Sequence, residues 1–319
     1  MDQNRQGAHP TVGFVGLGVM GRPMALNLLR AGFPLLVCSR SPAPVEALVR
    51  AGAMAAASPE ALAAATDVLI VMVPTTEDFE AVLTGELGAL SGLRAGAIVI
   101  DMGTHDPAAM TRLAARVRKQ GAWLIDAPVS GGEVGAQEAT LSIMVGGARR
   151  AVAAALPVLR AMGRNVVHIG GVGSGQIAKA CNQLVVGSTI EAVAEALALA
   201  AAAGVDPGRV RDAMLGGLAA SSVLELHGQR MLDGNFVPGG RVELHSKDAR
   251  IVLETARRLR VPIPGFAPVA VQLRSLVARG DGKLDHSALI TLVAGAHGLD
   301  PGSDRPAERL HRDRVTRSG

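Results

Sequence analysis

Short, continuously apolar runs alternate with helix-period segments through the first half of the chain. The runs are rich in β-branched residues and end in Gly, Ser, Pro or Asp. Unbroken apolar runs of this length are typical of strands buried on both faces of a parallel sheet. In chain order the runs are TVGFVG, PLLVCS, DVLIVMVP, AIVIDM, AWLIDAPV, LSIMVGG and NVVHIG. The segments between them, among them residues 21–31, 106–120 and 149–162, predict helices that cover both faces of the sheet.

The pattern changes after Gly170, and no later run has the composition of a strand. Residues 176–203 predict one helix, far longer than the usual ~11–12 residues. We therefore predict an α/β fold: a Rossmann-type, doubly wound, mostly parallel sheet over residues 10–170, followed by an all-α domain over residues 171–298. The long helix is expected to join the two domains. Residues 299–319 mix both charges with few apolar side chains, which predicts a disordered tail.

Composition narrows the class of protein. Hydrophobic residues make up 49% of the chain and aromatic residues only 2%, so the cores must be built from Ala, Val, Leu, Ile and Met. The net charge of +4 is small and the basic residues are scattered. A nucleic-acid interface needs clustered basic residues, and single strands also need aromatic stacking groups. Nucleic acid is therefore not an expected partner.

Three features bear on cellular location. The two cysteines, Cys38 and Cys181, provide no disulfide framework, which favours a reducing, cytoplasmic location. The first ten residues are polar and lack the apolar core of a signal peptide. The most apolar stretch, residues 192–204, contains Glu195 and is too short to span a bilayer, so no membrane partner is expected.

A glycine-rich loop follows the first predicted strand and precedes the first predicted helix. It has the form G-x-G-x-x-G and comprises Gly16, Leu17, Gly18, Val19, Met20 and Gly21. The three glycines of such a loop permit a tight turn, close approach of the backbone to a pyrophosphate, and close packing of helix on strand. The helix N-terminus then presents free N–H groups to the phosphates. In this strand–turn–helix context we predict a dinucleotide site.

The next predicted strand ends at Ser39, Arg40 and Ser41, where the adenosine ribose is expected. NAD sites commonly have Asp or Glu there, which accepts hydrogen bonds from the ribose hydroxyls. A guanidinium with two hydroxyls suits a 2′-phosphate instead. We therefore predict that NADP(H) is preferred over NAD(H), although a solvated loop arginine is the alternative interpretation of Arg40.

Four blocks of sequence occur in the order GFVGLGVMGRPMALNLLRAG (13–32), DAPVSGGEVGAQEATLSIMVGG (126–147), GSGQIAKACNQ (173–183) and HSKD (245–248). Together they resemble the β-hydroxyacid dehydrogenase family, which includes 3-hydroxyisobutyrate dehydrogenase and tartronate semialdehyde reductase. Residues 216–240 are more similar to the tartronate semialdehyde (2-hydroxy-3-oxopropionate) reductase branch. The resemblance covers nearly the whole chain up to residue 298. It implies an NAD(P)-dependent oxidoreductase of small hydroxyacids or semialdehydes, with a 6-phosphogluconate dehydrogenase-like helical domain that assembles into homodimers or homotetramers.

Lys179 corresponds to the catalytic lysine of that family. Gln176, Lys179, Asn182 and Gln183 recur at spacings of three and four residues, which gathers them on one face of the predicted long helix. Apolar residues surround this face, and partial desolvation lowers the pKa of a lysine toward neutral pH. An ammonium in this setting can protonate a carbonyl oxygen, and the amine can accept the hydroxyl proton in the reverse reaction. Without the resemblance, an ordinary solvated lysine would be the simpler interpretation.

Ser130, Gly131 and Gly132 follow the predicted strand WLIDAPV, at the carboxyl edge of the sheet. Ligands bind along that edge in open α/β folds. A hydroxyl and two unobstructed glycine amides can hold a substrate carboxylate, whereas a plain Gly-Gly turn has no such function. By resemblance these residues form the substrate-binding motif of the family, and Asn182 is a further substrate contact.

The resemblance also implies cofactor contacts outside the glycine-rich loop. Thr104 belongs to a segment beside the nicotinamide, while Val73 and Pro74 belong to a loop over the cofactor. Lys247 matches a lysine that closes the cofactor site from the second domain. Asp248 either orients Lys247 or caps its helix, and capping is the simpler interpretation.

Three residues depart from the family pattern. Gly103 stands where Ser is usual, Gly240 where Phe is expected, and Ala249 where Leu is usual. Gly240 removes a large apolar side chain near the expected cleft, so the pocket is expected to be wider or wetter. These departures bear on the identity of the substrate more than on the reaction.

Other classes of protein fit the sequence less well. The histidines form no H-E-x-x-H or comparable pair, so no metal is expected, and no G-x-S-x-G elbow of a serine hydrolase is present. Imine reductases share the architecture but usually lack a lysine at the position of Lys179. A non-catalytic nucleotide-binding protein would not need Lys179, Asn182 and the Ser130 motif together. We therefore expect hydride transfer between NAD(P)H and a small carboxylate semialdehyde, in a cleft between the domains, with Lys179 supplying the proton.

Overall fold

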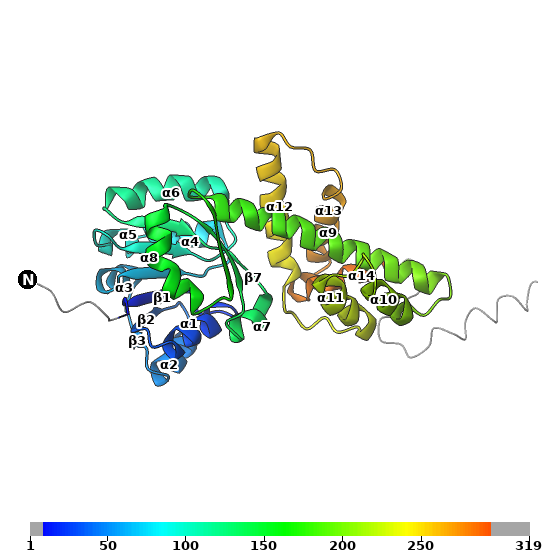
Figure 1. Ribbon diagram of the computed structural model, residues 1–319, viewed down its shortest axis with the longest axis horizontal. Helices are drawn as coiled ribbons and strands as arrows, with labels where there is room; N and C mark the ends of the chain where they lie inside the picture. The colour runs from blue at the N-terminus through cyan, green and yellow to red at the C-terminus, as the bar shows by residue number, and fades with distance from the viewer. Residues whose placement is uncertain (1–8, 295–319) are drawn as a thin grey trace, which may run out of the picture. The chain divides into compact units, whose positions relative to one another are not determined.

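The structure is a computed structural model that describes residues 9–294 (Figure 1). The chain divides into two compact units, Met1–Lys179 and Ala180–Gly319. The predicted boundary at residues 170 and 171 lies a few residues earlier than this division, which falls inside a long helix. The predicted tail over residues 299–319 lies outside the described residues.

The first unit contains a nine-stranded sheet. Its strands are β1 (Val12–Val15), β2 (Leu35–Cys38), β3 (Met54–Ala55), β4 (Val68–Val71), β5 (Ile98–Asp101), β6 (Trp123–Asp126), β7 (Val129–Ser130), β8 (Ser142–Gly146) and β9 (Asn165–Gly170). Their order is β3-β2-β1-β4-β5-β6-β8-β7, with β9 paired to β8. The strands from β3 across to β6 are parallel, whereas β8 runs antiparallel to β6 and β7. The predicted doubly wound, mostly parallel sheet is therefore confirmed, and its direction of winding reverses between β1 and β4.

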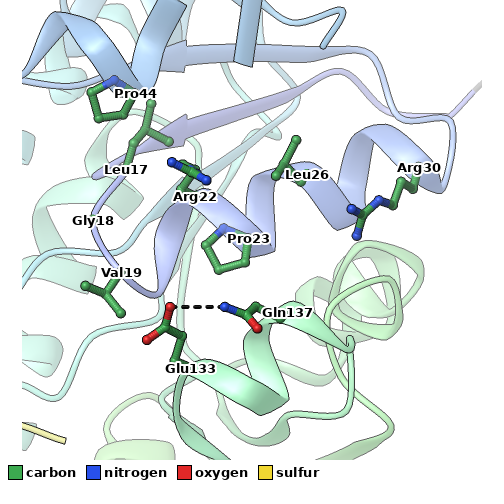
Figure 2. Close-up of a pocket in the computed structure, with 10 residues that line it drawn as sticks. All are labelled: Leu17, Gly18, Val19, Arg22, Pro23, Leu26, Arg30, Pro44, Glu133 and Gln137. Carbon is green, nitrogen blue, oxygen red and sulfur yellow. Dashed lines mark hydrogen bonds between the residues drawn. The ribbon is translucent and has the colours of Figure 1, made fainter. Parts of the chain in front are cut away.

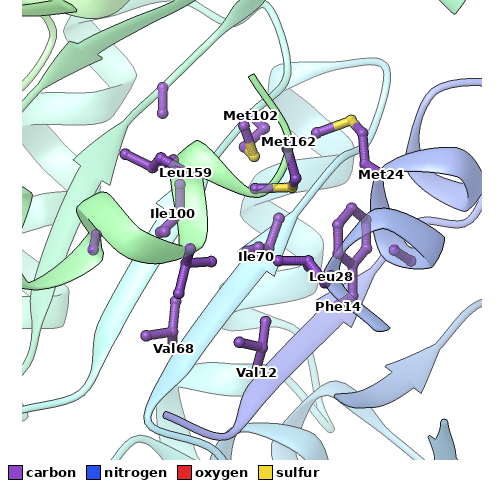
Figure 3. Packing of buried hydrophobic residues seen from close by; sticks show 14 of the residues in the cluster. Val12, Phe14, Met24, Leu28, Val68, Ile70, Ile100, Met102, Leu159 and Met162 are labelled. Atoms are coloured by element: carbon purple, nitrogen blue, oxygen red, sulfur yellow. The ribbon is translucent and has the colours of Figure 1, made fainter. Parts of the chain in front are cut away.

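Helices of the first unit cover both faces of this sheet. They are α1 (Gly21–Arg30), α2 (Pro42–Arg50), α3 (Pro59–Ala65), α4 (Thr76–Thr84), α5 (Ala89–Gly92), α6 (Pro107–Lys119), α7 (Gly132–Gln137) and α8 (Arg149–Arg160). One core cluster contains Val12 and Phe14 of β1 together with side chains of α1 and α8 (Figure 3). A second cluster contains Val15 together with side chains of α3, α4 and α6.

Strand β4 shows why the sequence runs are unbroken. Val68 and Ile70 belong to the first core cluster, while Leu69 and Val71 belong to the second. Successive side chains of a strand point to opposite faces, so a strand that is covered on both faces needs an apolar residue at every position. The continuous apolar pattern follows directly from this double burial.

The second unit is helical throughout its described part. Its helices are the greater part of α9 (Ser174–Ala202), then α10 (Pro207–Leu215), α11 (Ser222–Asp233), α12 (Val242–Leu259), α13 (Ala267–Ala278) and α14 (Ile290–Ala294), with 3-10 turns at Asp281–Lys283 and His286–Leu289. The core is built around Leu197, Leu224, Phe266 and Leu273. Up to residue 294 no strand follows β9, as the sequence predicted.

Helix α9 matches the predicted long helix closely. Among residues 9–294 it is the one helix long and apolar enough to cross a membrane by length and composition, with a most apolar window of mean hydropathy 1.7. The expectation of no membrane span rested on residues 192–204, a shorter stretch than this helix. Of that window, 44% is buried inside the protein. Ile190, Ala194 and Leu197 of this helix pack in the core of the second unit. A helix at the centre of a protein core meets the same criteria of length and hydropathy as a membrane-spanning helix.

Candidate active site

The glycine-rich loop joins β1 to α1 at the point where the winding of the sheet reverses. Gly16 has φ +92°, and a Cβ there would collide with the backbone carbonyl of Met72. A Cβ at Gly21 would collide with the carbonyl of Gly16, whereas a Cβ at Gly18 would meet nothing within 4 Å. The first glycine thus makes the turn, the last allows the helix to pack on the strand, and the middle one leaves the backbone open. This arrangement fits the pyrophosphate of a dinucleotide.

The start of α1 is suited to an anion. Within residues 9–294, no side chain caps this N-terminus, and its N-cap residue is Met20. The first N–H groups of a helix lack partners inside the helix, and the helix dipole adds partial positive charge there. Phosphates therefore bind favourably at such a terminus.

A pocket of about 600 Å³ lies beside the loop (Figure 2). Leu17, Gly18 and Val19 of the loop line it, and Arg22 and Arg30 line it from α1. Arg22 adds positive charge beside the loop, Arg30 adds it at the other end of α1, and Glu133 of α7 adds negative charge across the pocket (Figure 2). Neither arginine was expected at the site from the sequence, although both lie on the helix directly after the loop.

Arg40 lies just beyond the end of β2, as predicted. Its side chain is 86% exposed, and its Nη1 lies 3.6 Å from Oδ1 of Asp78, in the first turn of α4. An exposed pair at this distance contributes little to stability. The guanidinium is therefore accessible to a ligand phosphate, with Asp78 as a competing anion.

A buried polar network fixes the start of α9 on the sheet. The side-chain amide of Gln176 donates to Oδ2 of Asp101 and to the carbonyl of Gly103, both at 2.8 Å. Its Oε1 accepts from the backbone N–H of His105 at 2.9 Å. Asp101 is the last residue of β5, and Asp101, His105 and Gln176 are all essentially inaccessible to solvent. Buried polar groups are costly unless hydrogen-bonded, so this network holds α9 in one register at the carboxyl edge.

The ring of His105 occupies the space that a side chain at position 103 would need. The imidazole Nδ1 lies 2.9 Å from Oδ1 of Asp101, and Nε2 lies 3.2 Å from the carbonyl of Val73. A Cβ at Gly103 would lie 2.6 Å from the His105 Nε2 and 2.6 Å from the Val73 carbonyl oxygen. The space that a serine side chain would need is therefore filled by a histidine, so the departure at Gly103 is a packing requirement in this chain.

Asp126 makes a second attachment between the sheet and α9. It ends β6, and its two carboxylate oxygens accept from the backbone N–H of Gly173 at 2.7 Å and of Gln176 at 2.8 Å. Burial raises the pKa of Asp126 to about 6, the two hydrogen bonds oppose that rise, and the nearby charge of Asp101 adds to it. Asp101, Asp126 and His105 were not predicted as site residues, although both aspartates stand at the ends of predicted strands.

Lys179 lies one helical turn after Gln176 on α9. Its spacing of three residues from Gln176 places it on the same face of the helix, and it is only 7% exposed. An ordinary surface lysine on a helix would be largely solvated. The burial therefore excludes the simpler interpretation of Lys179 as a solvated lysine.

The Ser130-Gly131-Gly132 segment continues beyond the sheet edge. Ser130 pairs with Ser142 of β8, and α7 begins at Gly132. Gly131 and Gly132 have φ of +126° and +61°, and both are exposed. Their backbone is therefore accessible to a ligand, in a conformation that favours glycine at both positions.

In the second unit, an ion pair between Lys247 and Asp248 continues into a chain of side-chain hydrogen bonds. The Lys247 Nζ lies 2.9 Å from Oδ1 of Asp248, whose Oδ2 accepts from the side-chain amide of Gln183 at 2.6 Å. The Oε1 of Gln183 in turn accepts from Asn182 at 2.9 Å. Helix α12 begins at Val242 and its N-cap is Arg241, so the capping interpretation of Asp248 was wrong. Asp248 instead pairs directly with Lys247.

The other two departures from the family pattern have different surroundings. Ala249 is 1% exposed and belongs to the core of the second unit, so it is a packing residue. A Cβ at Gly240 would lie 3.0 Å from Cε1 of His286.

Two further predicted cofactor contacts, Thr104 and Pro74, follow strands of the sheet. Thr104 is half-buried after β5, and Pro74 is exposed after β4.

Two family models match consecutive parts of the chain. The first, described as the NAD binding domain of 6-phosphogluconate dehydrogenase, matches residues 11–170. The second, described as NAD-binding of NADP-dependent 3-hydroxyisobutyrate dehydrogenase, matches residues 173–293. Over 279 residues the chain is 43% identical to 2-hydroxy-3-oxopropionate reductase of Escherichia coli, which covers 88% of this chain and 95% of the reductase.

Solved structures agree with this match. The 3-hydroxyisobutyrate dehydrogenase of Salmonella typhimurium has a TM-score of 0.81 at 33% identity, over 88% of this chain and 99% of that one. Psf3, solved in complex with NADP⁺ and 2-OPP, has a TM-score of 0.81 at 27% identity, over 89% of this chain and 100% of that one. Fold and site together define an NAD(P)-binding oxidoreductase. The chain belongs to the β-hydroxyacid dehydrogenase family.

Proposed function

We propose that this hydroxyacid dehydrogenase is an NADPH-preferring reductase of 2-hydroxy-3-oxopropionate (tartronate semialdehyde). The observation that carries the choice of substrate is the 43% identity to the Escherichia coli reductase across 95% of its length. The similarity of residues 216–240 to that branch supports the same choice. The product is the hydroxyacid in which the aldehyde has become a primary alcohol.

When bound, NADPH would supply a hydride to the aldehyde carbon, while residues of this chain bind the substrate and supply the proton. Lys179 holds a proton on its ammonium and gives it to the aldehyde oxygen as negative charge develops there. In the oxidative direction the neutral amine accepts the hydroxyl proton. The Gln176 network supports this role because it fixes the helix that carries Lys179 against the carboxyl ends of the strands.

The substrate carboxylate and hydroxyl are assigned to Ser130, Gly131, Gly132 and Asn182. The accessible backbone and positive φ of Gly131 and Gly132 support this assignment, because backbone N–H groups without bulky side chains can approach a carboxylate closely. The amide of Asn182 is a donor and an acceptor, which suits a hydroxyl group.

The cofactor is assigned to the loop from Gly16 to Gly21, with Thr104, Val73, Pro74 and Lys247 as further contacts. The preference for NADPH rests on Ser39 and Arg40. The exposure of Arg40 supports it, since an accessible guanidinium can pair bidentately with a 2′-phosphate.

The direct test is an absorbance assay of NADPH and NADH oxidation with a panel of small semialdehydes. The proposal expects the highest kcat/KM with 2-hydroxy-3-oxopropionate and NADPH. A higher kcat/KM with methylmalonate semialdehyde would instead support a 3-hydroxyisobutyrate dehydrogenase, the alternative favoured by the Salmonella structure. Reduction of cyclic imines in preference to every semialdehyde would support an imine reductase. Cofactor binding without turnover of either class would make the chain a nucleotide-binding protein without this chemistry.

A further inference from the structure

Three histidines and one aspartate of the second unit meet in one cluster. His227 lies on α11, His245 lies on α12, and His286 begins a 3-10 turn directly after Asp285. The Nε2 atoms of His227 and His286 lie 3.2 Å apart. The Nδ1 atoms of His286 and His245 lie 2.9 Å apart, and Nδ1 of His227 lies 3.5 Å from Oδ1 of Asp285. No role in the hydride transfer described above uses this cluster.

We propose that His227 and His286 bind a divalent transition-metal ion, of the class of Zn²⁺ or Co²⁺, through their Nε2 atoms. Imidazole nitrogens bind zinc at ~2.0–2.1 Å, so two of them at a tetrahedral angle lie ~3.3 Å apart. The observed separation of 3.2 Å matches that spacing. The two ring planes are inclined by 78° and their centroids lie 4.5 Å apart, so the rings meet edge to face and do not stack.

The opposite nitrogen of each ligand histidine faces a polar neighbour. Asp285 lies beside Nδ1 of His227, and His245 lies beside Nδ1 of His286. Histidines that bind metals almost always engage a carboxylate or another polar group through the second nitrogen, which fixes the ring and its tautomer. The cluster therefore has both the ligand pair and the groups that orient it.

Asp285 acts as an orienting group and not as a ligand. Its Oδ2 accepts from the backbone N–H of Gly239 at 2.9 Å and of Gly240 at 3.0 Å, and its Oδ1 accepts from the Ser287 hydroxyl at 2.7 Å. Arg230 lies 3.2 Å from Oδ2, so the charge of this carboxylate is also paired. Two histidines then provide two ligands, and water or another small ligand must complete the coordination.

Gly240 lies against the ring of His286 and has no side chain to contact it. A Cβ at this position would lie 3.0 Å from Cε1 and 3.3 Å from Nε2 of His286, the nitrogen assigned to the metal. Any larger side chain would therefore crowd the coordinating edge of the ring. The glycine, where a phenylalanine was expected from the sequence, thus avoids crowding of that edge of the ring.

A hydrogen bond between the two Nε2 atoms is the competing explanation of the same distance. The two explanations differ in what a titration finds. The full-length chain, made without a histidine tag and stripped by dialysis against a chelator, is titrated with Zn²⁺ in a calorimeter. Co²⁺ is added in a second titration, because its visible absorption bands report direct nitrogen coordination. The proposal expects one Zn²⁺ per chain and a Co²⁺ spectrum that Zn²⁺ abolishes.

Matched variants locate the site. His227→Gln should lose this binding, and Gly240→Phe should lose it while both histidines remain. His9→Ala, a histidine of the first unit, should bind like the unaltered chain. Circular dichroism checks that each variant is folded. If His227→Gln does not fold, the loss of Zn²⁺ binding in Gly240→Phe tests the site. An unaltered chain that binds no Zn²⁺, or equal binding in a folded Gly240→Phe and the unaltered chain, would overturn the proposal.

Discussion

The side chain of Gln176 donates to the carboxylate of Asp101 across 2.8 Å, although the two residues are 75 positions apart in the sequence. This bond joins the first turns of α9 to the carboxyl end of β5. The backbone N–H of Gln176 is bound at the same time to Asp126, at the end of β6. The helix that carries Lys179 is therefore attached to two adjacent strands, and the position of its amine depends on those attachments.

Replacing Gln176 with Ala should destabilise the first unit and lower turnover together. The change leaves Asp101, the Gly103 carbonyl and the His105 N–H without their partner. Unsatisfied buried groups cost about 1–3 kcal/mol each, so three of them correspond to a loss of roughly 3–9 kcal/mol in the free energy of unfolding. Urea denaturation measures the loss. The control is Gln120→Ala, an exposed glutamine of the first unit, and an equal effect of both changes would contradict the account.

Gly103 and His105 should show strong energetic coupling. Gly103→Ala places a Cβ against the ring of His105 and the Val73 carbonyl, which we expect to cost about 1–3 kcal/mol. In the His105→Ala background most of that cost should disappear, because the ring is gone. A double-mutant cycle in urea denaturation measures the coupling. Additive effects of the two changes would show that the ring does not set the requirement for glycine.

Asp126 should make stability depend on pH in weakly acidic solution. Burial raises its pKa to about 6 from an ordinary value of 3.8, so the folded protein holds this proton more tightly than the unfolded chain. The stabilising contribution is complete below pH ~4 and is lost as pH rises through about 6. The difference between the two pKa values corresponds to roughly 3 kcal/mol.

The pH dependence is measured as the free energy of unfolding between pH 4 and 7, in the unaltered chain and in Asp126→Asn. The asparagine should lower stability overall, because its amide NH₂ faces a backbone N–H. It should also remove the downward slope with rising pH. An unchanged slope in the variant would assign the pH dependence to another group.

Substitutions of Arg40 and Asp78 should change KM for NADPH and leave KM for NADH nearly unchanged. Arg40→Ala removes the guanidinium expected to hold the 2′-phosphate, so KM for NADPH should rise roughly tenfold or more. Asp78→Asn removes the competing carboxylate 3.6 Å from Arg40, so KM for NADPH should fall. Steady-state kinetics with both cofactors measures the effects, and Arg50→Ala on α2 is the control. Equal changes for NADPH and NADH in Arg40→Ala would refute the 2′-phosphate assignment.

The sequence predicts some features of this molecule well because they are local. The unbroken apolar runs reflect strands with two covered faces, and the G-x-G-x-x-G loop is complete within six residues. The direction of β8 was not predictable, because a short apolar run has the same composition in either direction. Strand β3 has only two residues, both exposed, which is too short to form a recognisable strand pattern in the sequence.

Long-range polar contacts were the main omission at the candidate site. Asp101 and Asp126 are visible as residues that end apolar runs, but nothing local links them to Gln176, 75 and 50 positions away. His227 and His286 are 59 positions apart, so no short motif reveals their proximity. The sequence-based expectation that no metal binds rested only on such short motifs.

The most direct test of the account is the kinetics of Lys179→Ala beside its affinity for NADPH. The account predicts that kcat for 2-hydroxy-3-oxopropionate falls about 10²–10⁴-fold, because the proton donor is lost. The dissociation constant for NADPH, measured by fluorescence titration, should stay near that of the unaltered enzyme. Near-normal kcat, or a loss of NADPH binding large enough to explain the lost activity, would contradict the assignment of Lys179 as the catalytic acid and base.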